Sequence, residues 1–144
     1  MDHLIPFIGH YWLLCGAFLV VLIAIIFVEG RDAGLTGGLR VSPAELTHRI
    51  NRESAIVVDL QEIDAFREGH IVAARNIPFS TWSGAQAKLE KYRAASLILV
   101  DKSGQKAAGC ASELQKKGFE QVKYLGGGLV AWREAKYPLI KGSK

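Results

Sequence analysis

Cysteine is scarce in this chain of 144 residues, which contains only Cys15 and Cys110. Cys15 lies within a long apolar run and Cys110 lies in a helical pattern much further along the chain, so the two are not expected to pair. Without a disulfide framework, the cysteine content is typical of a protein from a reducing compartment.

Basic residues are missing from the N-terminal segment, because no Lys or Arg precedes Arg31. A cleaved secretory signal begins with a positively charged region and ends at a small-x-small cleavage site. The segment has no such charged region, and residues 27–30 (Phe-Val-Glu-Gly) offer no convincing cleavage site. A cleaved signal is therefore disfavoured, and an uncleaved anchor is predicted.

Charged and strongly polar residues are also absent from residues 11–28, an apolar run of 18 residues. A helix of roughly 20 apolar residues spans the core of a bilayer, so residues 11–29 are predicted to form one transmembrane helix. The alternative, a buried helix of a soluble protein, would need an amphipathic pattern or a large surrounding domain. Residues 1–10 would form a short external tail, and residues 30–38 a glycine-rich linker to a domain over residues 39–144.

The distribution of basic residues predicts the orientation of this anchor. All 18 Lys and Arg residues follow the apolar run, and basic residues close to a span stay on the cytoplasmic side of the membrane. The chain is therefore predicted to be a single-pass protein of the cell's inner (cytoplasmic) membrane, with its N-terminus outside and its domain in the cytoplasm.

The formal net charge of +4 bears on the partners of the chain. A basic domain held near an anionic leaflet is attracted to it. The basic residues are scattered among acidic ones and form no stripe, so nucleic-acid binding is not expected. The predicted partners are the membrane bilayer and a membrane or membrane-proximal protein. The identity of that protein, the pathway and the oligomeric state stay open.

From residue 39 onward, short apolar strands alternate with helical patterns, which is typical of a parallel sheet covered by helices on both faces. Ser42 and Pro43 are suited to begin the first of these helices. Strands are expected at residues 55–60, 76–77, 96–100 and 122–124, and later helices at 63–67, 83–92, 106–117 and 130–135. The predicted fold class is α/β.

The most informative segment for function is the loop after the strand at residues 97–100. Residues 101–106 of this loop are Asp101-Lys102-Ser103-Gly104-Gln105-Lys106, and a helical pattern follows them. A buried strand, a tight loop and a helix start form a layout in which consecutive backbone N–H groups cradle an anion. The six residues are therefore predicted to form such a cradle.

This loop resembles the active-site loop of the rhodanese family, in which a strand delivers a nucleophilic cysteine into a Cys-x-x-Gly-x-Arg-Ser cradle. The resemblance covers roughly residues 40–141, where the motifs are Asp59-Leu60-Gln61, Gly69-His70-Ile71, Asn76-Ile77-Pro78, Gly118-Phe119, Leu125-Gly126-Gly127-Gly128, Trp132 and Pro138-Leu139. It implies a rhodanese-like five-stranded parallel sheet with helices on both faces, here preceded by one transmembrane helix.

The chain departs from the family pattern at the nucleophile. Asp101 stands at the position of the cysteine, Lys106 at that of the Arg and Ala107 at that of the Ser. A carboxylate cannot take up and pass on a sulfane sulfur, but it can accept the inward N–H groups of the cradle permanently. No catalytic residue, cofactor or metal site is therefore expected. A phosphate-acceptor role for Asp101 would need Mg²⁺ and further carboxylates, and the sequence has no Asp-x-Asp pair.

Residues outside the loop are assigned supporting roles. Asp59 and His70 are expected to form a buried polar pair, and Gln61 stands where the family has an Arg. Trp82 is placed at the rim of the cradle as an apolar anchor, or alternatively in the core. The glycine run at residues 126–128 is expected to form a tight turn into the last helix.

The sequence therefore favours a membrane-anchored, catalytically inactive rhodanese-like domain that acts as a protein-interaction or regulatory module at the cytoplasmic membrane face. Lys102, Gln105 and Lys106 would form the recognition surface. The alternative is a sulfurtransferase with a non-standard thiol, for which Cys110 is the one candidate in the domain, although a buried Cys commonly serves as a small hydrophobe. A third possibility is a membrane-tethered scaffold, whose partners bind the span or another face.

Overall fold

The computed structural model describes residues 11–35 and 38–142 of the chain. The chain divides into two compact units, Met1–Gly37 and Gly38–Lys144. The boundary between them in the sequence falls within the segment predicted to be a linker. The predicted external tail, residues 1–10, lies outside the described residues.

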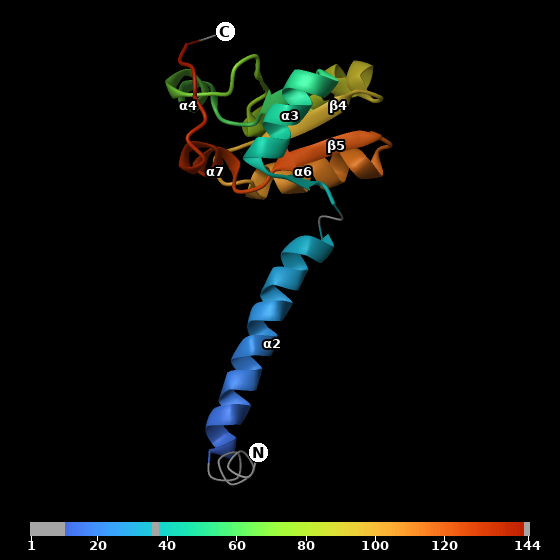
Figure 1. The fold of residues 1–144 in the computed structure, drawn as a ribbon. Helices are drawn as coiled ribbons and strands as arrows, with labels where there is room; N and C mark the ends of the chain where they lie inside the picture. Colours follow the sequence, from blue (N-terminus) through green and yellow to red (C-terminus); the bar gives the residue numbers. More distant parts are fainter. Residues whose placement is uncertain (1–10, 36–37, 143–144) are drawn as a thin grey trace. The chain divides into compact units, whose positions relative to one another are not determined.

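The first unit contains helix α2 (Trp12–Leu35), drawn in blue in Figure 1. The helix runs past residue 29 into the predicted linker, since a glycine inside a helix costs only about 1 kcal/mol relative to alanine. Its large apolar side chains from Trp12 to Phe27 are exposed. Within the described residues, no helix has both the length and the apolar character needed to cross a membrane. The transmembrane span stays a prediction.

The second unit is built on a five-stranded parallel sheet with the strand order β1-β5-β4-β2-β3. The strands are β1 (Arg40–Val41), β2 (Ile56–Asp59), β3 (Arg75–Asn76), β4 (Ser96–Val100) and β5 (Gln121–Leu125). Strand β4 lies at the centre, pairs with β2 and β5, and is buried at all five positions. An almost unbroken apolar run is what a strand covered on both faces requires. The predicted α/β fold is confirmed.

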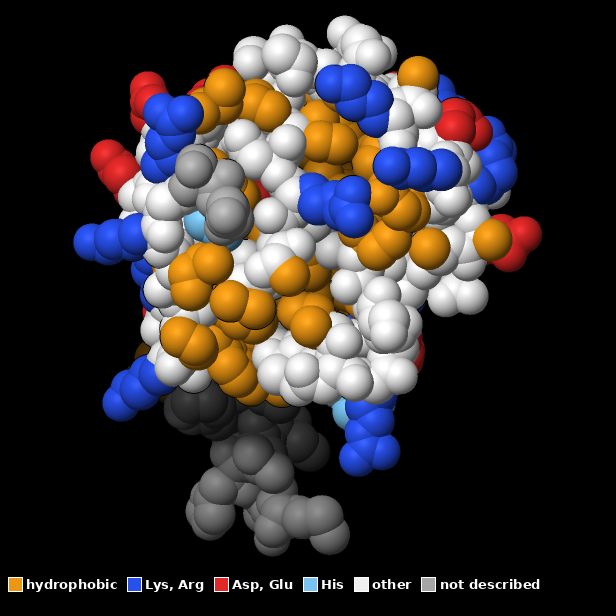
Figure 2. Space-filling view, turned by 90° about the horizontal axis from the view of Figure 1, so that it is seen from above, with side chains coloured by type: hydrophobic (Ala, Val, Ile, Leu, Met, Phe, Trp, Pro, Cys, Tyr) orange, Lys and Arg blue, Asp and Glu red, His pale blue; other side chains and the backbone are white. Residues whose placement is uncertain are grey.

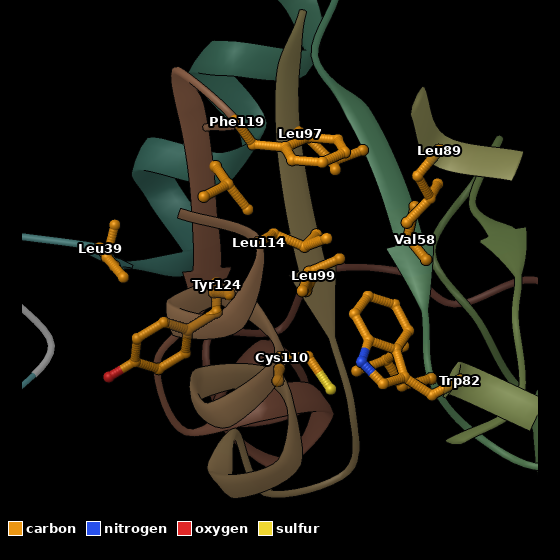
Figure 3. Packing of buried hydrophobic residues seen from close by; sticks show 14 residues of the cluster. Leu39, Val58, Trp82, Leu89, Leu97, Leu99, Cys110, Leu114, Phe119 and Tyr124 are labelled. Carbon is orange, nitrogen blue, oxygen red and sulfur yellow. The ribbon is translucent and has the colours of Figure 1, made fainter. Parts of the chain in front are cut away.

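Helices cover both faces of this sheet (Figure 1). On one face lie α3 (Pro43–Glu53), α4 (Ile63–Glu68) and α7 (Gly128–Glu134), and on the other α5 (Trp82–Ala85) and α6 (Gln105–Lys116). Successive side chains of a strand point to opposite faces, so Leu97 and Leu99 of β4 pack in the cluster with α6, which Figure 3 shows. Ile98 and Val100 pack in the other cluster. Because helices bury both faces of the sheet, a functional site is expected at its edges.

The helix predicted at residues 83–92 is wrong in type. The chain forms a short 3-10 turn, η1 (Phe79–Thr81), then the single α-helical turn α5, then the 3-10 helix η2 (Gln86–Tyr92). In a 3-10 helix, side chains three residues apart share one face. Leu89 and Tyr92 have this spacing, and both pack into the cluster with α6. The 3-10 geometry places both side chains on one face against this cluster.

The C-terminal segment returns to helix α4. His70 and Ile140 exchange backbone hydrogen bonds in both directions, each at 2.9 Å. Further along, the backbone N–H of Gly142 donates to the carbonyl of Arg67 at 2.9 Å. Residues 140–142 therefore form a strap, a short segment fastened to α4 and to the residue that follows its C-cap.

Candidate functional site at the carboxyl edge of the sheet

The loop after strand β4 folds around the carboxylate of Asp101. Its Oδ1 accepts the backbone N–H of Gly104 at 2.6 Å, and its Oδ2 accepts the backbone N–H of Lys106 at 3.2 Å. Asp101 is only 5% exposed, so the carboxylate lies inside the loop. Hydrogen bonds to a carboxylate are charge-assisted and stronger than neutral ones. The predicted inward orientation of Asp101 is confirmed, and the chain itself occupies these two N–H groups.

A glycine-rich turn supports the loop from the side of helix α7. The N–H of Leu129 donates to the carbonyl of Asp101 at 2.9 Å, and the N–H of Val130 donates to the carbonyl of Lys102 at 3.2 Å. Gly128 has a φ of +58°, and a Cβ added to it would lie 2.6 Å from the carbonyl oxygen of Lys102. The sequence predicts this turn, but it does not indicate that the turn holds the backbone of the loop.

A cavity of about 330 Å³ opens beside the loop. The loop forms one side, and the segment from the end of β2 to helix α4 forms the other. The lining residues are Leu60, Gln61, Glu62, Ala65, Asp101, Lys102, Ser103, Gln105 and Lys106. Open α/β sheets place ligands at the carboxyl ends of their strands. Residues 60–62 end or follow a predicted strand, so this rule could have assigned them to the site.

Two lysines stand at the rim of the cavity. Lys102 and Lys106 are exposed, and neither forms an ion pair within the described part of the domain. The ammonium group of Lys106 lies 4.8 Å from the centroid of the Phe79 ring, which is 40% exposed. The carboxylate of Glu62 is hydrogen-bonded to Ser80. It accepts the backbone N–H of Ser80 at 3.2 Å and the hydroxyl group of Ser80 at 2.9 Å. Phe79 is a site residue that the sequence did not indicate.

Asp59, Gln61 and His70 form a polar group next to the cavity, and Asp59 and His70 are fully buried. The backbone N–H of Gln61 donates to Oδ1 of Asp59 at 2.8 Å, and its amide donates to Oδ2 at 3.0 Å. Burial raises the pKa of Asp59, and the hydrogen bonds from Gln61 oppose this effect. Asp59 and His70 are therefore both buried beside the cavity, and Gln61 supplies hydrogen bonds to Asp59 from the position where the family has an Arg.

Trp82 does not lie on the rim, so its assignment there is wrong and the alternative position in the core is observed. The side chain is 6% exposed and packs in the cluster with α6 (Figure 3). Its indole N–H donates to Oε2 of Glu113 at 3.0 Å, and the amide of Gln86 donates to the other carboxylate oxygen at 2.7 Å. A buried indole needs such a partner, and Glu113 provides it.

Replacing Glu113 by alanine should destabilise the domain by about 1–3 kcal/mol, because the buried N–H of Trp82 loses its acceptor. The hydrogen bond from Trp82, followed by those from Gln86 and Lys117, lowers the pKa of the Glu113 carboxyl from 4.5 to about 2. The carboxylate therefore stabilises the fold above about pH 4.5 and loses this effect as the pH falls toward 2.

Urea unfolding of the wild type and Glu113→Ala at several pH values measures this difference, which should shrink as the pH falls through that window. The matched control is Glu120→Ala, since Glu120 is an exposed residue. A difference between wild type and Glu113→Ala that stays constant with pH would contradict the assignment.

Cys110, the one thiol of the domain, is 3% exposed and lies in the cluster with α6 (Figure 3). Burial raises the pKa of its thiol to about 12, with further contributions from the carboxylates of Glu113 and Asp101. The nucleophilic form of cysteine is the thiolate, and burial disfavours this charged form at Cys110. These observations do not favour the alternative of a sulfurtransferase that uses Cys110.

Iodoacetamide should alkylate Cys110 of the folded chain at least about a hundredfold more slowly than the same residue in urea, because the folded thiol is buried and protonated. Mass spectrometry of the peptide that contains Cys110 measures both rates, and the peptide with Cys15 is resolved separately. Equal rates with and without urea would show that the thiol is accessible and ionised in the fold.

The candidate site offers no set of metal ligands. Among the residues that the structure describes, His, Cys, Asp and Glu side chains form no group of three that could hold a metal ion. A phosphate-acceptor role for Asp101 would need such a carboxylate set around Mg²⁺, so the described residues do not favour it. The expectation of no cofactor stays a prediction.

Comparison with known proteins identifies relatives of the whole chain and of the domain. YibN of Escherichia coli strain K12, a protein described as uncharacterized, is 34% identical over 99% of this chain and 99% of its own length. The thiosulfate sulfurtransferase GlpE of Pseudoalteromonas translucida is 28% identical over 66% of this chain and 89% of its own. A solved rhodanese-related protein of Thermoplasma volcanium has 25% identity and a TM-score of 0.63, over 70% of this chain and 96% of that chain.

The family pattern covers the part of the chain that forms the sheet and the loop. The sequence pattern of the rhodanese-like domain matches residues 42–135, which include strands β2 to β5 and the residues that line the cavity. Fold and sequence agree on the assignment: the chain belongs to the rhodanese-like domain family.

Proposed function

We propose that this rhodanese-like domain does not transfer sulfur and serves as a protein-interaction or regulatory module. The observation that carries the proposal is the carboxylate of Asp101, which accepts the N–H groups of Gly104 and Lys106 inside the loop. By its resemblance to the family, the loop would hold the nucleophilic cysteine at this position. A carboxylate oxygen does not take up and pass on a sulfane sulfur, so the loop keeps an anion in the cradle without the chemistry of a thiolate.

The hydrogen bonds on both sides of the loop support a role in recognition. Asp101 satisfies the cradle from inside, so the loop needs no bound anion to keep its shape. The N–H groups of Leu129 and Val130 hold its backbone from outside. A loop held in this way presents Lys102 and Lys106 from a fixed backbone, which lowers the entropy cost of binding a partner.

A sulfurtransferase assay on the full-length chain in detergent tests the proposal, with thiosulfate as the sulfur donor and cyanide as the acceptor. Thiocyanate should form at the background rate for both the wild type and Cys110→Ala, while a GlpE protein serves as the positive control. Sustained turnover that survives Cys110→Ala would overturn the proposal. Turnover that this replacement abolishes would instead establish the sulfurtransferase alternative.

We further propose that helix α2 attaches the chain to a membrane, with the domain on the cytoplasmic side. The uncharged run of residues 11–28 and the basic residues that follow it support this attachment and orientation. The exposed apolar side chains from Trp12 to Phe27 also support it, because an apolar surface of this extent requires apolar cover.

Extraction and fusion experiments separate the attachment from the orientation. Alkaline carbonate should leave the chain in the membrane fraction, and detergent should release it. A fluorescent protein fused to the C-terminus should fluoresce, and alkaline phosphatase fused there should be inactive, if the domain is cytoplasmic. Release by carbonate would refute attachment through α2, and an active phosphatase would refute the orientation.

A further inference from the structure

We propose that the cavity beside the loop binds a segment of a protein partner in which an acidic side chain stands next to an apolar one. The inference rests on the proposed function and deepens it, because it names the chemistry that the loop recognises. Two lysines that line the cavity, the exposed ring of Phe79 against one of them, and the apolar lining by Leu60 and Ala65 carry it.

The charges around the cavity favour an acidic ligand. Lys102 and Lys106 line it, and neither has an ion pair within the described part of the domain. The carboxylates of Glu62 and Asp101 also line the cavity, but they accept hydrogen bonds from Ser80 and from the loop backbone and form no ion pair with either lysine. Two ammonium groups are therefore available to a ligand, and carboxylates are the groups of a protein that match them.

The charge balance of the domain as a whole does not oppose such a ligand. The domain, residues 38–144, contains 17 Lys and Arg against 11 Asp and Glu, and two of the acids, Asp59 and Asp101, are buried. On the face drawn in Figure 2, basic side chains stand among hydrophobic ones, and acidic side chains lie toward its edges. A positive potential of this kind attracts an acidic segment and steers its approach.

The exposed apolar side chains favour a ligand with an apolar group beside its carboxylate. Within residues 38–142, the exposed large hydrophobic residues are Ile63, Val72, Phe79 and Val130. Ile63 directly follows the cavity residue Glu62, the ring of Phe79 lies against the ammonium group of Lys106, and the N–H of Val130 bonds the carbonyl of Lys102. Three of the four thus belong to segments that follow the carboxyl ends of strands β2, β3 and β5, and exposed apolar groups near a cavity are typical of contact sites.

A small inorganic anion matches this site less well than a peptide segment. The N–H groups of Gly104 and Lys106, which could bind such an anion, are taken by Asp101. The side chains of Leu60 and Ala65 contribute apolar lining to the cavity of about 330 Å³, and a small anion would leave them uncovered. A segment with a carboxylate for the lysines and an apolar side chain for the cavity satisfies both.

Peptide selection tests the inference on the full-length chain in phosphatidylcholine nanodiscs. A phage-displayed library of random dodecapeptides is selected on the wild type and, in parallel, on the loop variant Lys102→Glu/Lys106→Glu. The matched control, Lys88→Glu/Lys116→Glu, changes the net charge equally at exposed residues outside the cavity lining. Fluorescence anisotropy then measures the affinity of an enriched peptide for all three proteins.

The enriched peptides should carry Asp or Glu beside Leu, Ile, Val or Phe. They should bind the loop variant at least about tenfold more weakly than the wild type, with weaker binding at higher salt, and the control within about twofold. No enrichment, enrichment without acidic residues, or equal binding by the loop variant would overturn the inference. Displacement of the peptide by phosphatidylglycerol vesicles would assign the lysines to a lipid surface and would overturn it too.

Failure of this inference is distinguishable from failure of the proposed function. The sulfurtransferase assay does not involve the peptide. If sulfur transfer stays at background and no peptide binds, the acidic and apolar partner is refuted, but the non-catalytic role is not. Sustained turnover by the wild type removes the proposed function whatever the peptides show.

Discussion

Replacing Gly128 by valine is expected to destabilise the domain by about 2–6 kcal/mol. Gly128 has a φ of +58°, and such a backbone costs a residue with a side chain about 1–3 kcal/mol. The added Cβ would also collide with the carbonyl groups of Asp101 and Lys102, and overpacking of this kind costs about 1–3 kcal/mol. Domains are stable by only about 5–15 kcal/mol, so much of the stability would be lost. Urea unfolding followed by tryptophan fluorescence measures the effect.

A second glycine provides the control. Gly109 lies in helix α6, where an added Cβ would meet nothing within 4 Å. Gly109→Ala should therefore stabilise the domain by up to about 1 kcal/mol through helix propensity. A Gly128→Val variant as stable as the wild type would show that the turn does not pack against the loop as described.

The Asp101→Cys variant should acquire a reactive thiol. Its thiolate would lie near the N–H groups of Gly104 and Lys106 at the N-terminus of α6, and such surroundings lower the pKa of a cysteine below its usual value of about 8.5. At neutral pH, alkylation by iodoacetamide should be at least about tenfold faster than in the control Ser103→Cys, whose position is exposed. Alkylation rates across the pH range, followed by mass spectrometry, give the pKa of each thiol.

The same variant should also take up sulfur. Its thiolate would attack the outer sulfur of thiosulfate, sulfite would leave, and the persulfide formed would pass its sulfur to cyanide as thiocyanate. We expect a rate above the background of the wild type, since the cradle persists when the side chain changes. An unreactive thiol with an ordinary pKa would mean that the N–H groups do not converge on this position, and the comparison of Asp101 with a thiolate would fail.

Much of the fold could be predicted because its signals are local and repeated. Residues 96–100 are almost entirely apolar, and so they indicate a central strand without knowledge of its neighbours. The helix over residues 83–92 could not be predicted in type, because the spacing of Leu89 and Tyr92 places both on one face of an α-helix and of a 3-10 helix alike. Their packing involves α6 and the sheet, which are distant in the sequence.

In the candidate site, too, the contacts between residues close in the sequence could be predicted and those between distant residues could not. The hydrogen bonds of Asp101 join residues three and five positions apart, so the loop motif alone indicates them. Trp82 bonds Glu113, a residue 31 positions away, and Phe79 meets Lys106 from a segment after another strand. No local pattern shows that Trp82 enters the core while the nearby Phe79 stays exposed. The assignment of Trp82 to the rim is therefore wrong.

The strap formed by residues 140–142 sets the boundary of the folding unit. A chain shortened to Ala135, where the family pattern ends, would remove Ile140 from both backbone hydrogen bonds of His70, a fully buried residue. Each buried group left unsatisfied costs about 1–3 kcal/mol. Helix α4, whose Ala65 lines the cavity, would lose its fastening at the same time. Proteolytic trimming of the C-terminus is therefore expected to loosen one wall of the cavity from a distance, and a stable piece of this domain should need residues beyond those that the family pattern matches.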